Sequence, residues 1–232
     1  MLKSDPDNLK GIGLLRGLSA SELEQAAKDC GWKQYAANEQ IIDRQSETTD
    51  VFLVVEGRVR VVNYSITGRE ITLDDIDAGG HFGELAAIDE KPRSASVMAL
   101  TPCNLAVISR DFFLDMIESH PGVAFLVMRD LAGIIRNSTV RIMDLSTLAA
   151  NNRVHADLLR LASANLTEDG IVSISPIPVH GDVASRVSTT RETVARVMND
   201  LARRGVVERL KDALMVNDVE KLREMVEEVR GE

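Results

Sequence analysis

The hydrophobic pattern of this chain changes its period near residue 110, and this change constrains the fold more than any other feature. From about Trp32 to Ser109, short runs rich in β-branched residues occur at 51–55, 59–62, 70–73, 95–100 and 105–108. Turn-forming pairs separate these runs: Glu56-Gly57, Thr67-Gly68, Gly79-Gly80 and Thr101-Pro102. Many short strands punctuated by glycine and proline favour an all-β roll or barrel.

Helical patterns flank this β-segment. Residues 19–30 begin with Ser19 and carry Glu22 three positions later, which is a capping-box signature for a short helix. A second short helix is predicted over 111–119 and ends near Pro121, and a long helical stretch follows from 122 to about 149.

The long stretch carries a row of residues with alternating spacings of three and four. Six of the seven positions are apolar, which indicates a coiled-coil seam: Met128, Leu131, Ile135, Ser138, Ile142, Leu145 and Ala149. A narrow seam needs a partner helix, so we expect a homodimer formed through residues 122–149. The alternative is a helix that packs on its own β-domain.

The C-terminal third predicts several short elements. Asn151-Asn152 is interpreted as a hinge, followed by a helix over 153–165 and two strands at 171–175 and 177–179. Two short helices come next, and then a hairpin with strands at 206–210 and 214–216. A charged helix from Asp218 is expected to be a packed, solvated tail, and the pattern assigns it no function.

Length and composition indicate an ordinary globular protein. The chain has 232 residues, of which 44% are hydrophobic and 27% are charged. No apolar run approaches the roughly 18 residues of a membrane helix, and the first 18 residues lack a signal-peptide core. We therefore expect a cytoplasmic protein without a membrane partner. Cys30 and Cys103 lie far apart and outside any CxxC pair, which favours two buried, reduced thiols.

The overall charge hides a local reversal. The net charge is −9, which by itself argues against nucleic-acid binding. Between residues 186 and 211, however, seven positive residues outnumber three negative ones, giving a local charge of +4. A basic patch on an acidic protein can still attract DNA to one face.

Residues 79–97 offer the groups that a small anionic ligand needs. Gly83 allows close backbone approach, and residues 84–87 favour a short helix whose free N–H groups would point at an anion. Arg93 supplies a positive fork for phosphate and Ser94 adds a hydroxyl donor. Glu84 suits an acceptor for a ligand hydroxyl, such as a ribose 2′-OH. The alternative is a Glu84–Arg93 surface ion pair beside an ordinary turn.

These residues resemble a known cassette. The run Gly83-Glu84-Leu85-Ala86, preceded by Gly79-x-x-Phe82 and followed by Arg93-Ser94-Ala95, looks like the phosphate-binding cassette of cyclic-nucleotide-binding domains. The chain is similar to the cyclic AMP receptor protein/FNR (Crp/Fnr) superfamily of transcription regulators from about Leu14 to Val216. The resemblance implies that Gly83 and Leu85 offer backbone groups, that Glu84 holds the ribose, and that Arg93 and Ser94 hold the phosphate. Cyclic AMP is the implied effector, with cyclic GMP as the alternative.

Ser138 and Thr139 interrupt the apolar seam. A small polar residue in a seam can fix its register, which is one interpretation. The resemblance implies another: Ser138 from one subunit and Thr139 from its partner contact the purine base. Many family members carry Thr then Ser, and this chain has the reverse order. Either hydroxyl can donate or accept, so the order leaves binding possible and base selectivity open.

Residues 180–205 predict a helix-turn-helix. Val183, Ala184 and Val187 form one apolar stripe; after Ser188-Thr189, a second helix carries Val194, Val197, Met198 and Leu201 inward. A threonine at 189 or 190 would cap this second helix. Its outward face presents Arg191, Glu192, Thr193 and Arg196. Arginine reads guanine and glutamate accepts from cytosine.

Residues 190–196, TRETVAR, resemble the recognition helix of the same superfamily. The likeness implies base contacts from Arg191, Glu192 and Arg196 on a TGTGA-like half-site in an inverted repeat. Two positions depart from the family pattern: Ser188 and Ser46 stand where many members have a turn glycine. Serine at 188 is strained if its φ is positive.

The predicted fold is α+β. It comprises an N-terminal β-roll (double-stranded β-helix or jelly roll) that binds a cyclic nucleotide at 1–121, a dimerisation helix and hinge at 122–150, and a C-terminal winged helix-turn-helix at 151–232. The implied protein is a homodimeric regulator in which ligand reorients the DNA-binding domains. Its partners would be double-stranded DNA and RNA polymerase. No nucleophile–base pair or metal cluster supports an enzyme, and no metal cofactor is expected.

Three alternatives remain open at this point. The same frame could sense another ligand or bind DNA constitutively. An iron–sulfur sensor needs about four cysteines, and this chain has two; a haem sensor would use one of His81, His120, His155 and His180. A nucleotide-binding subunit without DNA function is disfavoured by residues 190–196.

Overall fold

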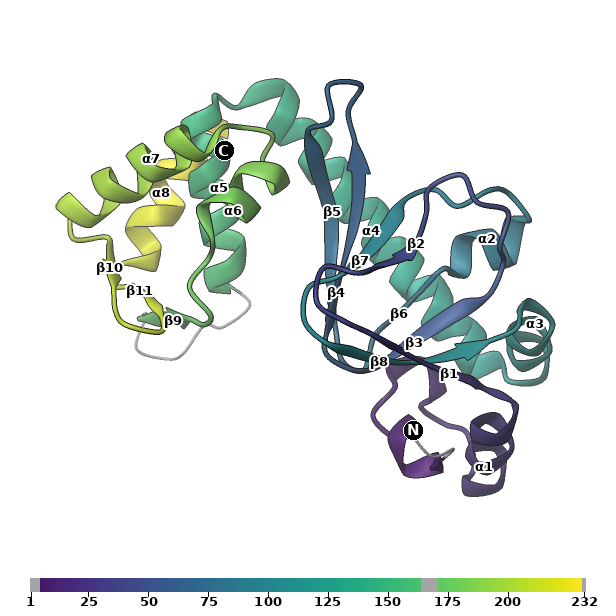
Figure 1. Ribbon diagram of the computed structural model, residues 1–232. Coiled ribbons are helices and arrows are strands. Elements are labelled where there is room, and N and C mark those ends of the chain that lie inside the picture. Colours follow the sequence, from purple (N-terminus) through teal and green to yellow (C-terminus); the bar gives the residue numbers. More distant parts are fainter. Residues whose placement is uncertain (1–4, 164–170, 231–232) are drawn as a thin grey trace. The chain divides into compact units, whose positions relative to one another are not determined.

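The computed structural model describes residues 5–163 and 171–230 (Figure 1). The chain divides into two compact units, Met1–Ile134 and Ile135–Glu232, and the division falls inside the long helix α4 (Pro121–Thr147). Each unit has its own hydrophobic core. The first unit is a β-roll and the second is a winged helix-turn-helix, so the predicted fold class is confirmed.

Two four-stranded antiparallel sheets form the first unit. One has the strand order β1-β8-β3-β6 and the other β2-β7-β4-β5. The strands are β1 (Gly31–Tyr35), β2 (Gln40–Ile42), β3 (Val51–Glu56), β4 (Arg58–Tyr64), β5 (Glu70–Asp77), β6 (His81–Phe82), β7 (Ser96–Ala99) and β8 (Cys103–Ile108). Buried side chains from both sheets, including Phe52, Val59 and Leu105, form one continuous cluster between them.

The predicted strands lie where the β-branched runs are, but three short strands were missed. Strands β1, β2 and β6 are polar or only two or three residues long, so they carry no clear alternation. Strand β5 continues four residues beyond the predicted end at 73. It pairs with β4 along its length, and its acidic residues Asp75 and Asp77 bind Arg60 and Arg58 of that strand.

Helices cover the outer face of the first sheet. Two short 3₁₀ segments (Pro6–Leu9 and Gly13–Leu15) precede α1 (Ala20–Asp29), and α3 (Arg110–Ser119) leads into α4. The predicted capping box of α1 is confirmed, since Glu22 accepts from the Ser19 amide at 2.7 Å. Phe113 and Met116 of α3 pack with Val123 of α4 against the sheet.

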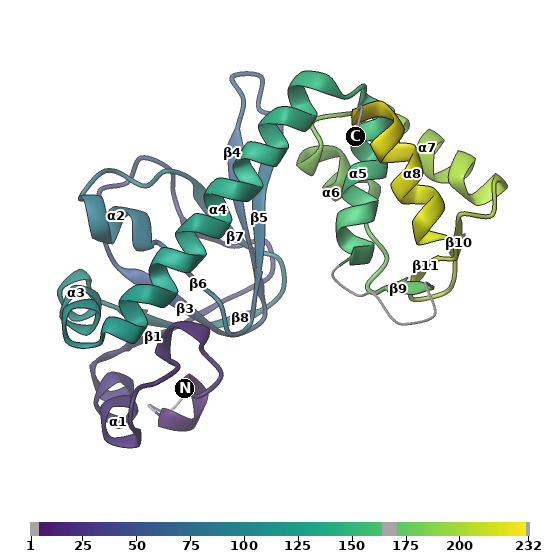
Figure 2. The same ribbon diagram turned by 180° about the vertical axis from the view of Figure 1, so that it is seen from behind.

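Helix α4 is long (Figure 2), and its sequence carries an apolar row. Its first turns bury Val123 and Val127 in the core of the first unit. Farther along, three residues spaced seven apart are exposed in the single chain: Met128 by 58%, Ile135 by 66% and Ile142 by 63%. The start of the helix therefore packs on its own β-domain, as the alternative holds, and the coiled-coil seam along the exposed row stays a prediction. No described helix is long and apolar enough to cross a membrane.

The second unit contains the rest of α4 and seven further elements: α5 (Ala150–Ser163), β9 (Val172–Ile174), α6 (His180–Arg186), α7 (Arg191–Arg203), β10 (Val207–Arg209), β11 (Leu214–Val216) and α8 (Val219–Arg230). The three strands form one antiparallel sheet in the order β10-β11-β9. Val194, Leu201 and Leu214 belong to the core that these elements share. Helix α8 buries Val219, Leu222 and Val226, which confirms the packed charged tail.

Two details of this unit differ from the prediction. Asn151-Asn152 is not a hinge but lies in the first turn of α5, and the break between α4 and α5 falls at Leu148-Ala149. Helix α5 runs through both asparagines because its apolar residues Val154, Leu158 and Ala162 pack in the core of the unit. Residues 177–179 form no strand and lead directly into α6. The predicted end of α5 at Asn165 lies outside the described residues.

Candidate ligand site and DNA interface

The turn before α2 (Glu84–Asp89) lets the side chain of Arg93 come close to the backbone of Gly83. Gly83 caps this helix with φ +93°, a conformation that favours glycine. A Cβ atom on Gly83 would lie 2.7 Å from Nη1 of Arg93 and 2.8 Å from the carbonyl oxygen of Asp50. Both the backbone angle and the lack of space therefore require glycine, and they let Arg93 lie directly against this turn, in a cradle formed by Gly83, Asp50 and Arg93.

Arg93 is the central cation of this cradle. Its Nε donates to Oγ1 of Thr48 at 3.1 Å, Nη1 to the carbonyl of Gly83 at 2.9 Å, and Nη2 to the carbonyl of Asp50 at 2.7 Å. The residue is only 4% exposed, and its guanidinium carbon lies 5.9 Å from the centre of the Phe52 ring. The bonds hold the guanidinium in one orientation.

The charge of Arg93 lacks a direct counter-ion in the described part of the chain. Burial lowers the pKa of Arg93, while the charges of Asp50 and Glu84 oppose that shift. An arginine nevertheless stays protonated at neutral pH. No described carboxylate forms a salt bridge with it, so the alternative of a Glu84–Arg93 surface ion pair is wrong. A buried cation with neutral partners is suited to an incoming anion.

The other cassette residues lie around this cation. Glu84 is 9% exposed at the start of α2, Leu85 is 41% exposed, and Ser94 is exposed. The Ser94 carbonyl accepts from Nδ2 of Asn63 at 3.4 Å, and the buried Oδ1 of Asn63 has no partner among the described residues. All five predicted cassette residues thus belong to the first unit.

Three neighbours of the cassette were not found by sequence reasoning. Thr48 and Asp50 precede β3, and Asn63 lies on β4, so each is at least 31 residues from its partner in the cassette. No local pattern marks residues that meet only when strands pair.

The two residues predicted to contact the base, Ser138 and Thr139, lie on α4 in the second unit. Both are exposed, and the Thr139 hydroxyl donates to the Ile135 carbonyl at 3.0 Å.

The predicted recognition helix is α7. Its cap is Thr190, whose hydroxyl accepts from the Thr193 amide at 3.2 Å. Arg191, Glu192 and Arg196 are exposed, as expected for groups that contact DNA. Thr193 is half-buried and its hydroxyl lies 3.1 Å from that of Thr190, so it takes part in the cap as well.

A hollow opens beside the first turn of α7. The hollow lies between the segment before α6, the start of α7 and the wing, which is the hairpin of β10 and β11. It is lined by Ile177, Pro178, Val179, His180, Arg191, Glu192, Ala195 and Arg209. The side chain of Arg191 lies over Gly181, where an added Cβ would be 3.0 Å from its Nε. Arg196 instead donates weakly to Oδ1 of Asn151 at 3.4 Å.

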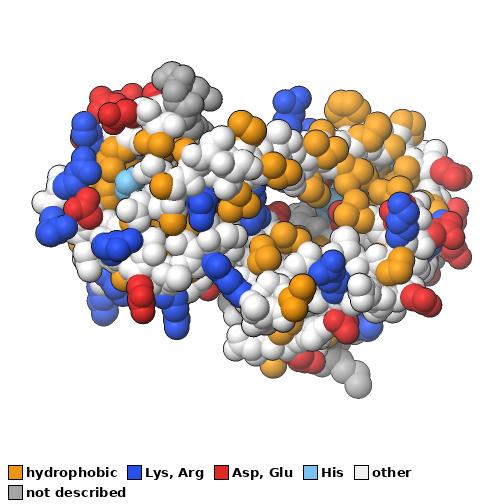
Figure 3. Space-filling view, turned by 90° about the horizontal axis from the view of Figure 1, so that it is seen from above, with side chains coloured by type: hydrophobic (Ala, Val, Ile, Leu, Met, Phe, Trp, Pro, Cys, Tyr) orange, Lys and Arg blue, Asp and Glu red, His pale blue; other side chains and the backbone are white. Residues whose placement is uncertain are grey.

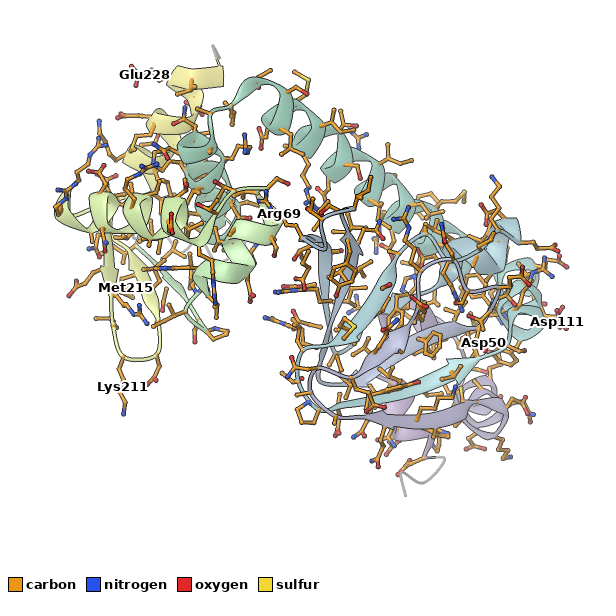
Figure 4. All side chains as sticks on the ribbon, turned by 45° about the horizontal axis from the view of Figure 1, so that its top comes forward. Asp50, Arg69, Asp111, Lys211, Met215 and Glu228 are labelled. Carbon is orange, nitrogen blue, oxygen red and sulfur yellow. The ribbon has the colours of Figure 1, made fainter. Side chains whose placement is uncertain are left out.

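Positive side chains gather on the unit that carries α7. Figure 3 shows lysine and arginine side chains on this surface, and the exposed members on α7 and after it include Arg191, Arg196, Arg209 and Lys211. Lys211 lies at the tip of the hairpin formed by β10 and β11 (Figure 4). The predicted basic residues are therefore exposed on both α7 and the hairpin of β10 and β11, as DNA binding requires.

The turn between α6 and α7 carries the predicted strain. Ser188 has φ +51°, so a serine occupies a left-handed position. The next residue closes the turn, since the Thr189 amide donates to the Ala184 carbonyl at 3.0 Å. Just before the turn, Arg186 binds the buried carboxylate of Asp157 with Nη2 at 2.8 Å.

The four histidines lie on separate elements. His120 binds the Glu22 carboxylate at 2.7 Å, and His155 is buried in α5. In residues 5–163 and 171–230, no group of three His, Cys, Asp or Glu residues could hold a metal ion.

Comparison with known proteins identifies both units. Residues 32–120 match the family of cyclic nucleotide-binding domains, and residues 152–225 match the Crp-like helix-turn-helix domain. The chain is 32% identical to the cyclic AMP receptor protein of Thermus thermophilus over 199 residues, which cover 86% of this chain and 89% of that protein. These families and relatives are transcription regulators, not enzymes.

Solved structures share the fold. A mutant of CooA from Carboxydothermus hydrogenoformans has a TM-score of 0.76 at 22% identity, covering 86% of this chain and 88% of CooA. CprK in complex with OCPA has a TM-score of 0.71 at 16% identity, covering 88% and 93%. At these identities the likeness concerns the fold alone.

Proposed function

Since this chain belongs to the Crp/Fnr family of DNA-binding transcription regulators with a cyclic-nucleotide-binding domain, we propose that cyclic AMP is its effector. Cyclic AMP would favour the DNA-binding state of a homodimer. Residues 1–121 would bind the nucleotide, 122–150 would form the dimer helix and hinge, and 151–232 would bind DNA. The relative from Thermus thermophilus is named a cyclic AMP receptor protein.

The observation that carries this proposal is the neutral coordination of Arg93. A buried guanidinium with only neutral acceptors, beside a glycine that leaves no room for a Cβ, fits a singly charged cyclic phosphate. Arg93 and Ser94 would hold the phosphate, and the backbone at Gly83 and Leu85 would add donors or acceptors. Glu84 accepts no hydrogen bond from a described residue, so its carboxylate suits a ribose hydroxyl.

The base would be recognised by the central helices. Ser138 and Thr139 are exposed hydroxyl residues within the apolar row of α4. The exposed Met128, Ile135 and Ile142 support pairing of this helix with a second copy. Ser138 of one subunit and Thr139 of the partner would then contact the purine. Because a hydroxyl can donate or accept, these two residues favour no purine by themselves, and cyclic GMP is the competing effector.

DNA would be read by the first turns of α7. Arg191 and Arg196 would donate to guanine, and Glu192 would accept from cytosine in a TGTGA-like half-site. Thr193 would contribute less because its hydroxyl is used in the cap. Two subunits would place two such helices about one turn of DNA apart on an inverted repeat. RNA polymerase is the expected partner of the DNA-bound dimer.

The test is a fluorescence-anisotropy titration of a TGTGA-N6-TCACA duplex at fixed salt with no ligand, cyclic AMP or cyclic GMP. Cyclic AMP should tighten binding at least tenfold, which corresponds to about 1.4 kcal/mol of coupling. Arg196→Ala should weaken DNA binding by about 1–3 kcal/mol and leave cyclic AMP affinity unchanged. Arg203→Ala is the matched control, since it changes an exposed arginine at the other end of α7.

Each outcome decides a separate part of the proposal. Tightening by cyclic GMP alone would replace the effector and keep the switch. Equal binding in all three conditions would reject a cyclic-nucleotide switch and favour another ligand, as in the OCPA complex of CprK. Binding no stronger than to a scrambled duplex would reject the assigned base contacts.

A further inference from the structure

Arg153 joins the end of α4 to the turn before the recognition helix. It lies in the first part of α5, and its guanidinium bonds to backbone carbonyls on both sides. Nη1 donates to the Leu148 carbonyl at 2.9 Å, Nε to the Val187 carbonyl at 2.8 Å, and Nη2 to the Ser188 carbonyl at 3.1 Å. One side chain thereby connects the α4–α5 break with the turn that sets the start of α7.

Electrostatics favour a cation at this place. The Leu148 carbonyl follows the last turn of α4, and the Val187 carbonyl follows the last turn of α6. The C-terminal ends of helices carry a partial negative charge, so both ends attract the guanidinium. Arginine has a planar fork that can reach three acceptors in fixed directions, whereas a lysine ammonium acts as a point charge.

The break is also held through its side chain. Leu148 is 4% exposed and packs with Ala156 of α5 and Val226 of α8. Helices α5 and α8 lie side by side in the second unit (Figure 2). The break between α4 and α5 is therefore held by packing against α8 and by the hydrogen bond from Arg153. We expect it to be a rigid part of the DNA-binding unit.

We propose that Arg153 is a positioning residue for DNA binding: it fixes the turn before α7 to the end of α4. The direction of α4 then determines the direction of α7. This inference rests on the proposed dimerisation of α4, because two recognition helices fixed to paired central helices must have a fixed separation. The consequence is a preferred spacing between the two DNA half-sites.

A first experiment needs neither ligand nor DNA. Amide hydrogen exchange is measured on the full chain and on Arg153→Ala, Arg153→Lys and Arg160→Ala. The amides of Leu148 and Thr189 are hydrogen-bonded, and we expect both to exchange at least about tenfold faster in the two Arg153 variants. Arg160 is the matched control, because it is on the same helix but binds the Asp157 carboxylate instead of the break or the turn. Unchanged exchange at either amide in both Arg153 variants would overturn the inference.

A second experiment separates positioning from a merely structural role. The same proteins are titrated with TGTGA-Nx-TCACA duplexes in which the spacer x runs from about four to eight. The wild-type chain should prefer one spacer over its neighbours by about tenfold or more, and both Arg153 variants should reduce that preference at least about fivefold. Arg160→Ala should retain it.

The remaining outcomes are also informative. Equal weakening on every spacer, with the preference retained, would show a structural role and overturn the inference. The same holds if Arg153→Lys behaves as wild type, because a single charge would then suffice. If the wild-type chain binds no duplex above a scrambled one, the proposed half-site is wrong, and the exchange experiment alone decides the role of Arg153.

Discussion

Arg93 in the first unit and Arg186 in the second are both largely removed from solvent, but their charges are balanced in different ways. Arg93 donates to two backbone carbonyls and one hydroxyl, all of them neutral. Arg186 binds both carboxylate oxygens of Asp157. Burial raises the pKa of Asp157, but Arg186 and Arg160 together outweigh burial and lower it. Arg93 therefore has no counter-ion within the described residues, whereas the charge of Arg186 is already neutralised by Asp157.

The difference shows that burial alone does not identify a binding residue. A buried ion pair such as Arg186–Asp157 satisfies itself, and its removal would affect folding first. A buried arginine with neutral acceptors is oriented without being neutralised, so an anion can still bind it. The local sequence does not show which of the two arginines is neutralised, so the partners in the fold distinguish a buried cation that can take an anion from one that is already paired.

The largest effect should come from breaking the structural pair. Asp157→Ala leaves the largely buried Arg186 without its counter-ion and should lower the free energy of unfolding of the second unit by about 3–5 kcal/mol. Amide exchange in the core of α7, for example at Leu201, would measure this loss. Asp200→Ala is the matched control, since its exposed pairs with Arg203 and Arg204 should contribute less than about 1 kcal/mol. Similar losses in both variants would contradict the distinction.

The next effect concerns the ligand. Arg93→Ala should weaken cyclic AMP binding by about 100-fold, equivalent to about 2.8 kcal/mol, because it removes a charged phosphate donor. Isothermal titration calorimetry on the full chain measures the change. Arg58→Ala serves as the control: it removes an arginine that already pairs with Asp77, and it should leave the affinity unchanged. If Arg93→Ala retained full affinity, Arg93 would be structural like Arg186.

Sequence reasoning identified residues whose role is local. Each of three features follows from chemistry within a few residues: the turn at Gly83, the helix cap at Thr190, and the strain that a positive φ would cause at Ser188. The partners of Arg93 could not be predicted in this way, because Thr48 and Asp50 reach it only through strand packing. The length of β5 was missed for a similar reason, since its acidic residues are stabilised by arginines on the neighbouring strand.

The hinge shows how a local rule can fail. Two adjacent asparagines resemble a break, but the chain places them in the first turn of α5, two residues after the real one. Helix α4 ends at Thr147. The next residue, Leu148, packs its side chain with Ala156 and Val226, and its carbonyl accepts a hydrogen bond from Arg153. Neither signal is visible in the sequence near the break.

A smaller effect should come from the strained turn. Ser188→Gly removes the steric cost of a left-handed serine and should stabilise the second unit by about 0.5–1 kcal/mol. Ser46→Gly offers the comparison in the first unit, where the left-handed residue is the adjacent Gln45 instead. Since the Ser46 hydroxyl also donates to the Asp43 carbonyl at 2.8 Å, this substitution should give no gain. Urea unfolding of each variant decides whether the two turns differ.

The smallest effect should be a difference in the pH dependence of the two units. The pKa of His120 is raised, chiefly by its hydrogen bond to Glu22, whose own pKa is lowered to about 2 and which therefore stays charged. The folded first unit holds the His120 proton more tightly than the unfolded chain does. That stabilisation is complete below the ordinary pKa of about 6.5 and is lost as the pH rises through the raised value.

His155 in the second unit should act in the opposite direction. Its pKa is lowered, first by burial and then by the charge of Arg204, with Asp200 opposing. This stabilisation by His155 is therefore present above the ordinary pKa of about 6.5 and lost as the pH falls through the lowered value.

Two measurements separate the units. Fluorescence of Trp32, the one tryptophan, follows unfolding of the first unit, and amide exchange at Leu201 follows the second. His120→Gln should flatten only the first profile and His155→Gln only the second, because the two histidines belong to different units. A change in both profiles from one substitution would mean that the units do not respond to pH independently.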